Sequence, residues 1–289
     1  MGRQLFSKMD LSDIRSAQKN DTSDLAFFLN QARYVHRHLD WRPILDWLGE
    51  GSFWILDQDH KVQAAFACPD DPPGIAWVRL FACSSQISPD DAWVRLFTTE
   101  LDSVNTSPNR TLAAIALHDW FMRLLLRHGW IEYQQIVTLA WDGGFPTEPR
   151  LPAGAIIRPI LPEDLPEITR IDNLAFEPLW RLSQSALNHA YEQSAFATLL
   201  EVNGQIIAYQ MSTATSFNAH LARLAVLPQM QGQKIGYTLV YDLLKQLDRL
   251  QVRSATVNTQ HDNLASQALY QRLGFIHTGE HFPVLVYKD

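Results

Sequence analysis

The residues best suited to chemistry lie between Leu224 and Gly236, in the run Leu-Ala-Val-Leu-Pro-Gln-Met-Gln-Gly-Gln-Lys-Ile-Gly. A strand-like apolar pattern ends at Pro228, a loop containing glycine follows, and a helix pattern begins directly after it. Free backbone N–H groups and the positive end of a helix dipole therefore meet at one point, which favours a phosphate or pyrophosphate ligand. The spacing fits neither a Walker A loop nor the glycine fingerprint of dinucleotide-binding folds.

A second segment runs from Asn263 to Phe275 and reads Asn-Leu-Ala-Ser-Gln-Ala-Leu-Tyr-Gln-Arg-Leu-Gly-Phe. It resembles the N-x-x-A-x-x-L-Y-x-x-x-G-F segment of the GCN5-related N-acetyltransferase (GNAT) family, with Ser266 where alanine is more common. The first run resembles motif A of that family, a Q/R-x-x-G-x-G/A loop after a strand ending L-x-V-x-P; the matching residues are Leu224, Val226, Pro228, Gln231 and Gly236. Two motifs in the right order identify residues 155–289 as similar to this family.

The resemblance implies acetyl-CoA, or another acyl-CoA, as the donor. Its pyrophosphate would be held by backbone amides of the loop, which are those of Gln231, Gly232, Gln233, Lys234, Ile235 and Gly236. The strand edge at Leu224, Ala225 and Val226 would bind the pantetheine arm, and Asn263 and Ser266 would line it. Tyr270 would protonate the departing thiolate, a task that suits a phenol with a pKa of about 10.

One loop residue departs from the family pattern. Lys234 stands where the family prefers glycine. A left-handed backbone there would strain a lysine by roughly 1–2 kcal/mol. Because Gln233-Lys-Ile-Gly reads as a normal helix start, we expect ordinary helical dihedral angles at Lys234, with its ammonium near the phosphates.

The acceptor side has fewer signals. His220 stands at the head of a predicted strand, where the family often carries its general base, and an ordinary histidine pKa of about 6.5 suits that task. The alternative is a half-exposed histidine at a strand end. Phe176, Trp180 and Arg181 lie between two predicted helices and are candidates for shaping the acceptor site, although aromatic residues there can equally serve packing.

Two histidine strings resemble metal sites but are not expected to bind one. His277-Thr-Gly-Glu-His281 matches an H-x-x-E-H zinc string. That chemistry needs a helix, whereas the flanking residues predict a strand. His36 and His38 lie in an expected helix, where side chains two residues apart diverge. We therefore expect no metal cofactor.

The chain divides at a run rich in proline and glycine. Residues 142–154 contain three of each and cannot continue a helix or a central strand. We expect a linker there, between a domain at 1–141 and a domain at 155–289. Similar patterns recur at an offset near 143, from Ile14-Arg15 to Ile157-Arg158 and from Phe53 to Phe196, which indicates one fold repeated in tandem.

The second half reads as strands alternating with helices, which predicts a mixed-sheet α/β (α+β) fold. The expected strands are 156–159, 196–202, 206–211, 220–227, 255–260 and 275–287, and the expected helices are 162–176, 183–194, 235–250 and 264–273. With the resemblance, this implies two tandem GNAT folds. The first is a degenerate copy, because Leu125 replaces the tyrosine and the expected phosphate loop near Ile87–Asp91 has two acids and no glycine.

Composition excludes several classes. The chain of 289 residues has 46% hydrophobic residues, a formal charge of −7 and a pI of about 5.8, which argues against a nucleic-acid-binding surface. No run approaches the ~18 apolar residues of a membrane span. We expect no signal peptide within Met1–Asp13, and Cys68 and Cys83 show no disulfide framework, so we expect a cytoplasmic protein.

These observations lead to one leading hypothesis and an alternative. The leading one is an acyl-CoA-dependent N-acyltransferase, most simply an acetyltransferase, whose acceptor is a primary amine of a small molecule or peptide. The alternative is a non-catalytic module that binds CoA or a partner, motivated by Lys234 and the missing carboxylate base. A thiol-sugar acceptor, as in mycothiol synthase, also stays open, and the sequence does not indicate an oligomeric state.

Overall fold

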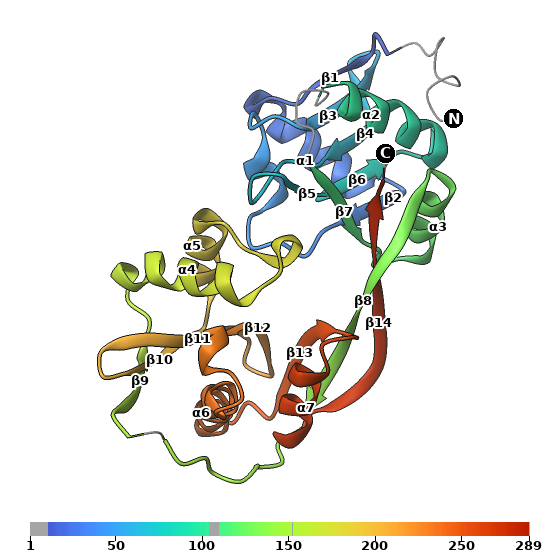
Figure 1. Cartoon of the computed structure of the whole chain (residues 1–289). Coiled ribbons are helices and arrows are strands. Elements are labelled where there is room, and N and C mark those ends of the chain that lie inside the picture. Colours follow the sequence, from blue (N-terminus) through green and yellow to red (C-terminus); the bar gives the residue numbers. More distant parts are fainter. Residues whose placement is uncertain (1–10, 104–109, 152, 289) are drawn as a thin grey trace. The chain divides into compact units, whose positions relative to one another are not determined.

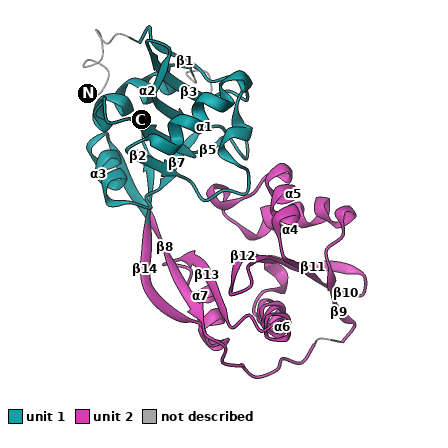
Figure 2. Cartoon of the chain, turned by 180° about the vertical axis from the view of Figure 1, so that it is seen from behind, with its two compact units in different colours: residues 1–133, 283–289 teal, residues 134–282 magenta. Residues whose placement is uncertain are grey.

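The computed structural model describes residues 11–103, 110–151 and 153–288, which form two compact units. Unit 1 comprises Met1–Tyr133 and Pro283–Asp289, and unit 2 comprises Gln134–Phe282 (Figure 2). The expected boundary at 142–154 differs from this division. Residues 142–154, of which Pro152 lies outside the described residues, join two strands of unit 2. The division between the units falls instead within strands β8 (Trp130–Trp141) and β14 (Ile276–Tyr287), each of which contributes one end to each unit.

Unit 2 follows the expected order of strands and helices. Its elements are β9 (Ala155–Pro159), α4 (Leu165–Ala175), α5 (Gln184–Gln193), β10 (Phe196–Val202), β11 (Gln205–Ala214), β12 (Asn218–Val226), α6 (Ile235–Arg249), β13 (Ser254–Gln260) and α7 (Leu264–Arg272). The sheet order is β14-β8-β13-β12-β11-β10-β9. Strands β12 and β13 are parallel and β9 to β12 are antiparallel, so the mixed α/β class is confirmed.

The helices of unit 2 cover both faces of this sheet. Helices α4 and α5 lie on one face and α6 on the other (Figure 1). Leu239, Leu243 and Leu247 are fully buried on one side of α6, as their spacing predicts. The hairpin between β10 and β11 turns at Asn203 and Gly204, both with positive φ. No helix in the described part of the chain is long and apolar enough to cross a membrane.

Unit 1 repeats much of this plan with one change. Its elements are β1 (Ile14–Ser16), α1 (Thr22–Gln31), β2 (Tyr34–Arg37), β3 (Phe53–Gln58), β4 (Lys61–Ala67), β5 (Ile75–Trp77), β6 (Leu80–Cys83), α2 (Pro89–Ser103), β7 (Thr111–Ile115) and α3 (Asp119–Arg127). One sheet has the order β1-β3-β4-β6-β2, and β5 pairs in parallel with β7. Where unit 2 has α5, between its first long helix and its hairpin, unit 1 has strand β2.

The same ion pair joins β1 in unit 1 and β9 in unit 2 to the turn that follows each strand. Arg15 donates two hydrogen bonds to Asp21 at 2.9 and 2.8 Å, and Arg158 donates two to Asp164 at 2.6 and 2.9 Å. In both units the aspartate also accepts from the backbone N–H three residues before it. Residues 15 and 158, like 21 and 164, are 143 positions apart. The periodic sequence pattern therefore corresponds to a repeated set of contacts.

Candidate active site

A cavity in unit 2 opens where two parallel strands diverge. Strand β12 pairs with β13 only from Asn218 to Leu221, so the following residues of β12 leave one edge open among the described strands. A cavity of about 180 Å³ lies there. It is lined by Ile136, Phe176, Trp180, Leu221, Ala222, Arg223, Leu224, Val257, Asn258, Thr259, Gln260, Asn263, Ser266 and Tyr270.

A β-bulge at Ala222 determines which side chains face which side of the sheet. Met211 pairs with Arg223 and Ser212 pairs with Leu221, which leaves Ala222 without a partner on β11. Leu221 packs into the core beneath α6, whereas Arg223 bonds to Asp172 of α4 on the opposite face. Regular alternation would give residues 221 and 223 the same face, so the bulge turns the arginine toward α4.

The open edge of β12 presents two backbone groups. Leu227 N–H donates to Ile207 O at 2.9 Å, and antiparallel pairs alternate between bonded and non-bonded. Leu224 and Val226 therefore direct their backbone groups to the open edge, while Ala225 bonds toward β11. The Gln231 side chain donates to Val226 O at 3.1 Å and ties the loop to the strand end.

The loop before α6 contains two left-handed residues. Gly232 has φ of +76° and Lys234 has φ of +64°. The expected helical conformation of Lys234 is therefore wrong: α6 begins at Ile235, and Lys234 is the N-cap that turns the chain into the helix, at a cost of about 1 kcal/mol. No side chain of the described residues caps α6, so the N–H groups of its first turn remain available to a ligand.

Gly236 serves packing rather than backbone freedom. A Cβ atom at this position would lie 2.9 Å from Leu269 of α7, and 3.6 Å from Leu224 and from Val226 of β12. The glycine therefore lets the start of α6 approach both elements closely. This contact brings the loop Gln231–Gly236 to the open edge of β12.

Helix α7 brings Tyr270, the residue predicted as the acid, to the cavity. Tyr270 is 5% exposed, lines the cavity, and its hydroxyl bonds to none of the described residues. Burial raises the pKa of Tyr270 above its usual value, which keeps the phenol protonated. Asn263 caps α7 by accepting from Ser266 N at 3.1 Å, so both also line the cavity as structural parts of the helix start.

Two of the three predicted acceptor residues lie at the cavity. Phe176 lines it, and the Arg223 guanidinium lies 3.5 Å from its ring centroid. Trp180 also lines it and donates from Nε1 to Gln134 Oε1 at 3.0 Å. Arg181 is outside the lining and donates instead to Phe176 O at 3.1 Å.

His220, the candidate base, is not among the residues that line the cavity. Its Nδ1 lies 2.8 Å from Thr256 Oγ1 on β13. Burial lowers the pKa of His220, so the imidazole is neutral at pH 7 and able to accept a proton. His220 therefore lies outside the lining of the cavity that Tyr270 lines, and its role as the base stays a prediction.

A buried cluster that the sequence did not predict holds the predicted acceptor wall, which contains Phe176 and Trp180. Asp172 is fully buried and accepts from Arg223 Nε at 2.7 Å and Nη2 at 2.8 Å, from Tyr209 at 2.5 Å, and from Leu182 N at 3.0 Å. Arg223 also donates to Trp180 O at 2.7 Å. An aspartate on the apolar face of α4, one residue after the buried Ile171, was the available sequence signal.

The corresponding groove of unit 1 is closed by its own chain. Strand β2 pairs with β6 along the edge that faces away from β4. Strand β6 precedes the helix α2 as β12 precedes α6, and in β12 the corresponding edge stays open beyond Leu221. His36 of β2 donates to Val78 O at 3.1 Å and stacks on Phe121 with ring centroids 3.8 Å apart. Leu125, 145 positions before Tyr270, is fully buried.

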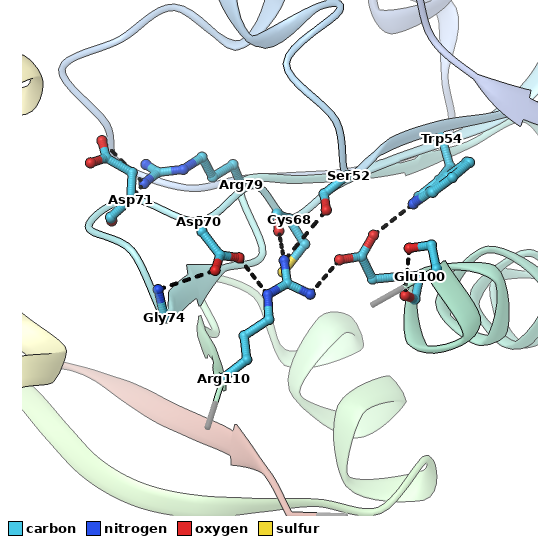
Figure 3. Close-up of polar contacts among 10 residues, drawn as sticks. Ser52, Trp54, Cys68, Asp70, Asp71, Gly74, Arg79, Glu100 and Arg110 are labelled. Atoms are coloured by element: carbon cyan, nitrogen blue, oxygen red, sulfur yellow. Dashed lines mark hydrogen bonds and ion pairs between the residues drawn. The ribbon is translucent and has the colours of Figure 1, made fainter. Parts of the chain in front are cut away.

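The buried charges of unit 1 are satisfied internally. Glu100 of α2 is fully buried and accepts from Arg110 at 2.5 Å and from Trp54 Nε1 at 2.6 Å (Figure 3). Arg110 also bonds to Asp70 and to the Cys68 carbonyl. With every charge paired, the network is suited to joining α2 to β3 and β7 rather than to catalysis.

His36 of the first histidine string and both histidines of the second lie in strands. His36 is in β2, which corrects the expected helix: Tyr34–Arg37 pairs with β6, so long-range pairing overrides the local pattern. His277 and His281 lie in β14, as expected, with Gly279 between them at φ of +87°. In the residues that the structure describes, no three His, Cys, Asp or Glu side chains are grouped to hold a metal ion.

Comparison with known proteins identifies the family. The family model "Acetyltransferase (GNAT) family" matches residues 165–275. The [ribosomal protein bS18]-alanine N-acetyltransferase of Escherichia coli (strain K12) is 30% identical over 112 residues, covering 39% of this chain and 74% of that protein. The chain belongs to the GNAT acetyltransferase family. The spore coat polysaccharide biosynthesis protein SpsD of Bacillus subtilis is 27% identical over 103 residues, 32% of this chain, and the match spans only 36% of its length.

Solved structures extend the GNAT fold to both units. A tandem GNAT protein from the clavulanic acid biosynthesis pathway matches with a TM-score of 0.64 at 15% identity, covering 94% of this chain and 97% of the other. A GCN5-related N-acetyltransferase from Anabaena variabilis matches with a TM-score of 0.68 at 12% identity, covering 94% and 71%. At these identities the likeness shows the fold alone, and it confirms the tandem GNAT arrangement.

Proposed function

We propose that unit 2 transfers an acetyl group from acetyl-CoA to a primary amine of a small molecule or peptide by direct attack. The observation that carries the proposal is the meeting of an uncapped helix, an open strand edge and a buried tyrosine around one cavity. Membership of an acetyltransferase family supports the reaction class. A relative named for acetylating an alanine of a ribosomal protein supports an amine acceptor.

The residues of unit 2 fit acetyl-CoA as co-substrate. The open N–H groups from Gly232 to Gly236 suit a pyrophosphate, because the loop and the dipole of α6 both favour negative charge, whereas the Gln231 N–H donates to Pro228 O at 3.3 Å. Leu224 and Val226 offer backbone groups to an amide-bearing arm, as a neighbouring strand would receive them. Lys234 adds a positive charge beside the loop.

The chemistry would then use Tyr270, which lines the cavity, and His220, which lies outside its lining. Acetyl-CoA supplies a thioester carbonyl that an amine can attack. Tyr270 would donate its phenolic proton to the leaving sulfur, since burial keeps that phenol protonated. His220, neutral at pH 7, would take the proton released by the amine. The cavity would hold the amine beside the thioester, so that the two reactants meet in a fixed orientation.

Calorimetry and a transfer assay test this proposal. Acetyl-CoA titrated into the full chain should bind with one site per chain, because the groove of unit 1 is occupied by β2. A panel of amines should then give acetylated product and release free CoA thiol. Absence of acetyl-CoA binding would overturn the proposal.

One observation favours the non-catalytic alternative. Among the described residues that line the cavity there is no aspartate, glutamate or histidine to act as a base. In that case the chain would bind CoA tightly and show no transfer to any amine of the panel. With either function, we propose that the protein is located in the cytoplasm. Two free, buried cysteines, Cys68 and Cys83, are compatible with that location.

A further inference from the structure

The acceptor side of the cavity carries one cation and no anion. Arg223 is the charged side chain among the described lining residues. Its guanidinium is 12% exposed and is held from behind by Asp172. Nε and Nη2 make all the bonds to Asp172 and to Trp180 O, and Nη1 bonds to none of the described residues. The Nη1 group of the guanidinium is therefore available to bind a ligand.

The polar neighbours of Arg223 also present donors. Asn258 Oδ1 accepts from Thr138 Oγ1 at 3.0 Å, which leaves the Nδ2 amide protons unpaired. Gln260 stands two residues further along β13 on the same face of the strand, and its Oε1 lies 3.5 Å from Thr259 Oγ1. Both amide groups thus have their oxygens turned to threonine hydroxyls and their NH₂ groups available.

Together these groups match one kind of ligand atom. A cavity wall with several free donors, one of them a guanidinium, and no free carboxylate favours anionic oxygen over a second ammonium group. We propose that the acceptor is an amine carrying a carboxylate, an amino acid in the broad sense, whose carboxylate binds Arg223 Nη1 with Asn258 and Gln260. This inference rests on the proposed transferase function and narrows its substrate class.

The bulge at Ala222 makes this selectivity a property of the site. If β12 alternated regularly through Ala222 instead of bulging there, Arg223 would share the face of Leu221 and lie in the core beneath α6. The ion pair with Asp172 and the ring of Phe176 then fix the guanidinium in one orientation. A rigid, prepositioned donor loses little entropy when it binds a carboxylate.

The test compares amines that differ only at the carboxylate. Alanine, alaninamide and ethylamine, and likewise phenylalanine, phenylalaninamide and phenethylamine, are assayed with acetyl-CoA, and kcat/KM is corrected for the fraction of free amine at the assay pH. We expect the acid of each series to exceed its amide and its decarboxylated amine by about ten-fold or more. Equal values, or a preference for the amide or the plain amine, would overturn the proposal.

Two variants locate the effect. Asn258→Asp and Gln260→Glu keep the side-chain size and place a negative charge beside Arg223, so the acid-to-amine ratio should fall by about ten-fold. Gln205→Glu adds the same charge at an exposed residue at the start of β11 and should leave the ratio unchanged. An unaltered ratio in both cavity variants would place the carboxylate elsewhere and reject the assignment.

A binding measurement separates this inference from the transferase proposal. N-acetylalanine and N-acetylethylamine are titrated into the chain saturated with CoA and into the chain alone. Tighter binding of N-acetylalanine, weakened in Asn258→Asp, supports the carboxylate site even if no amine is acetylated. Failure of acetyl-CoA to bind rejects the transferase proposal by itself, and equal affinity of the two products rejects the carboxylate site.

Discussion

Unit 1 and unit 2 repeat one plan, and the segment between the first long helix and the hairpin separates them. In unit 2 this segment forms α5, which Ser183 caps by accepting from Ala186 N at 3.0 Å. In unit 1 it forms β2, which pairs with β6 and places His36 on Phe121. The groove is therefore open in one copy and filled in the other by about four residues of the same chain.

The N-termini of α2 and α6 also differ, because the first is capped by a side chain and the second is not. At α2, Ser88 Oγ accepts from Asp91 N at 3.1 Å, and two acids occupy the first turn. At α6 no side chain of the described residues provides a cap, and Lys234 precedes the helix. Because a cap consumes the N–H groups that a phosphate would use, only the second helix start is prepared for an anion.

The largest expected effect concerns the tyrosine that unit 1 lacks. Tyr270→Phe should lower kcat by about 100-fold, because the leaving sulfur loses its proton donor, while the Kd for acetyl-CoA stays within about two-fold. Tyr191→Phe removes only a long bond of 3.3 Å to Ile160 O and serves as the control. An unchanged kcat would remove Tyr270 as the acid.

The filled groove of unit 1 should make that unit sensitive to acid. Burial lowers the pKa of His36 to about 3, whereas the unfolded chain binds this proton near the ordinary value of 6.5. As the pH falls, the unfolded state therefore binds a proton at His36 before the folded state does. The free energy of unfolding should fall below about pH 6.5, and at pH 5 the contribution of His36 to this loss should be about 2 kcal/mol.

Urea unfolding at pH 7 and pH 5, followed by hydrogen exchange in unit 1, measures this loss. His36→Gln keeps a donor for Val78 O and should reduce the loss, whereas His60→Gln, at an exposed turn, should not. Burial also lowers the pKa of His38 to about 3, so both variants should retain the part of the stability loss between pH 7 and pH 5 that comes from His38. The same loss in His36→Gln as in the native chain would contradict the prediction.

A charge change at the helix start should make unit 2 resemble unit 1. Lys234→Asp places an acid before α6, as at α2, and aspartate tolerates the left-handed backbone. The Kd for acetyl-CoA, measured by calorimetry, should rise by about ten-fold through repulsion. Lys234→Asn should have a smaller effect and Lys61→Asp, at the exposed start of β4, none; equal affinity in Lys234→Asp would exclude phosphates from this loop.

The smallest effect is expected at a residue that β8 contributes to unit 2. Gln134 accepts from Trp180 Nε1 at 3.0 Å and donates to Asp262 at 3.0 Å, so it joins the acceptor wall to the start of α7. Gln134→Ala should raise the acceptor KM by about five-fold with kcat nearly unchanged, since Trp180 loses a positioning bond. Gln134→Glu retains the acceptor oxygen for Trp180 and should recover part of the loss; a changed kcat with native KM would contradict a positioning role.

Local patterns predicted much of unit 2. The Asn203-Gly204 turn, the leucine spacing of α6 and the strand before Pro228 depend on residues close in sequence, and each is found where expected. Asn263, Ser266 and Tyr270, which the family resemblance named, and Phe176 and Trp180, which were named for their place between two helices, all line one cavity, while their roles stay predictions.

The errors share one physical cause. Lys234 reads as a helix residue, yet packing of Gly236 against Leu269 fixes the helix start and requires a left-handed turn before it. His36 reads as helical, yet pairing with β6 makes it a strand. In each case a contact between distant residues overcomes a local preference of about 1 kcal/mol.

The sequence alone determined the tandem plan, the phosphate-type loop and the tyrosine, because these follow from short-range spacing and from an offset near 143 residues. Only the tertiary structure decided that β2 closes one groove, that β8 and β14 are divided between the units, and that the bulge at Ala222 turns Arg223 toward Asp172 of α4. Such features depend on strand register and on buried charge pairing, which form only when distant segments meet.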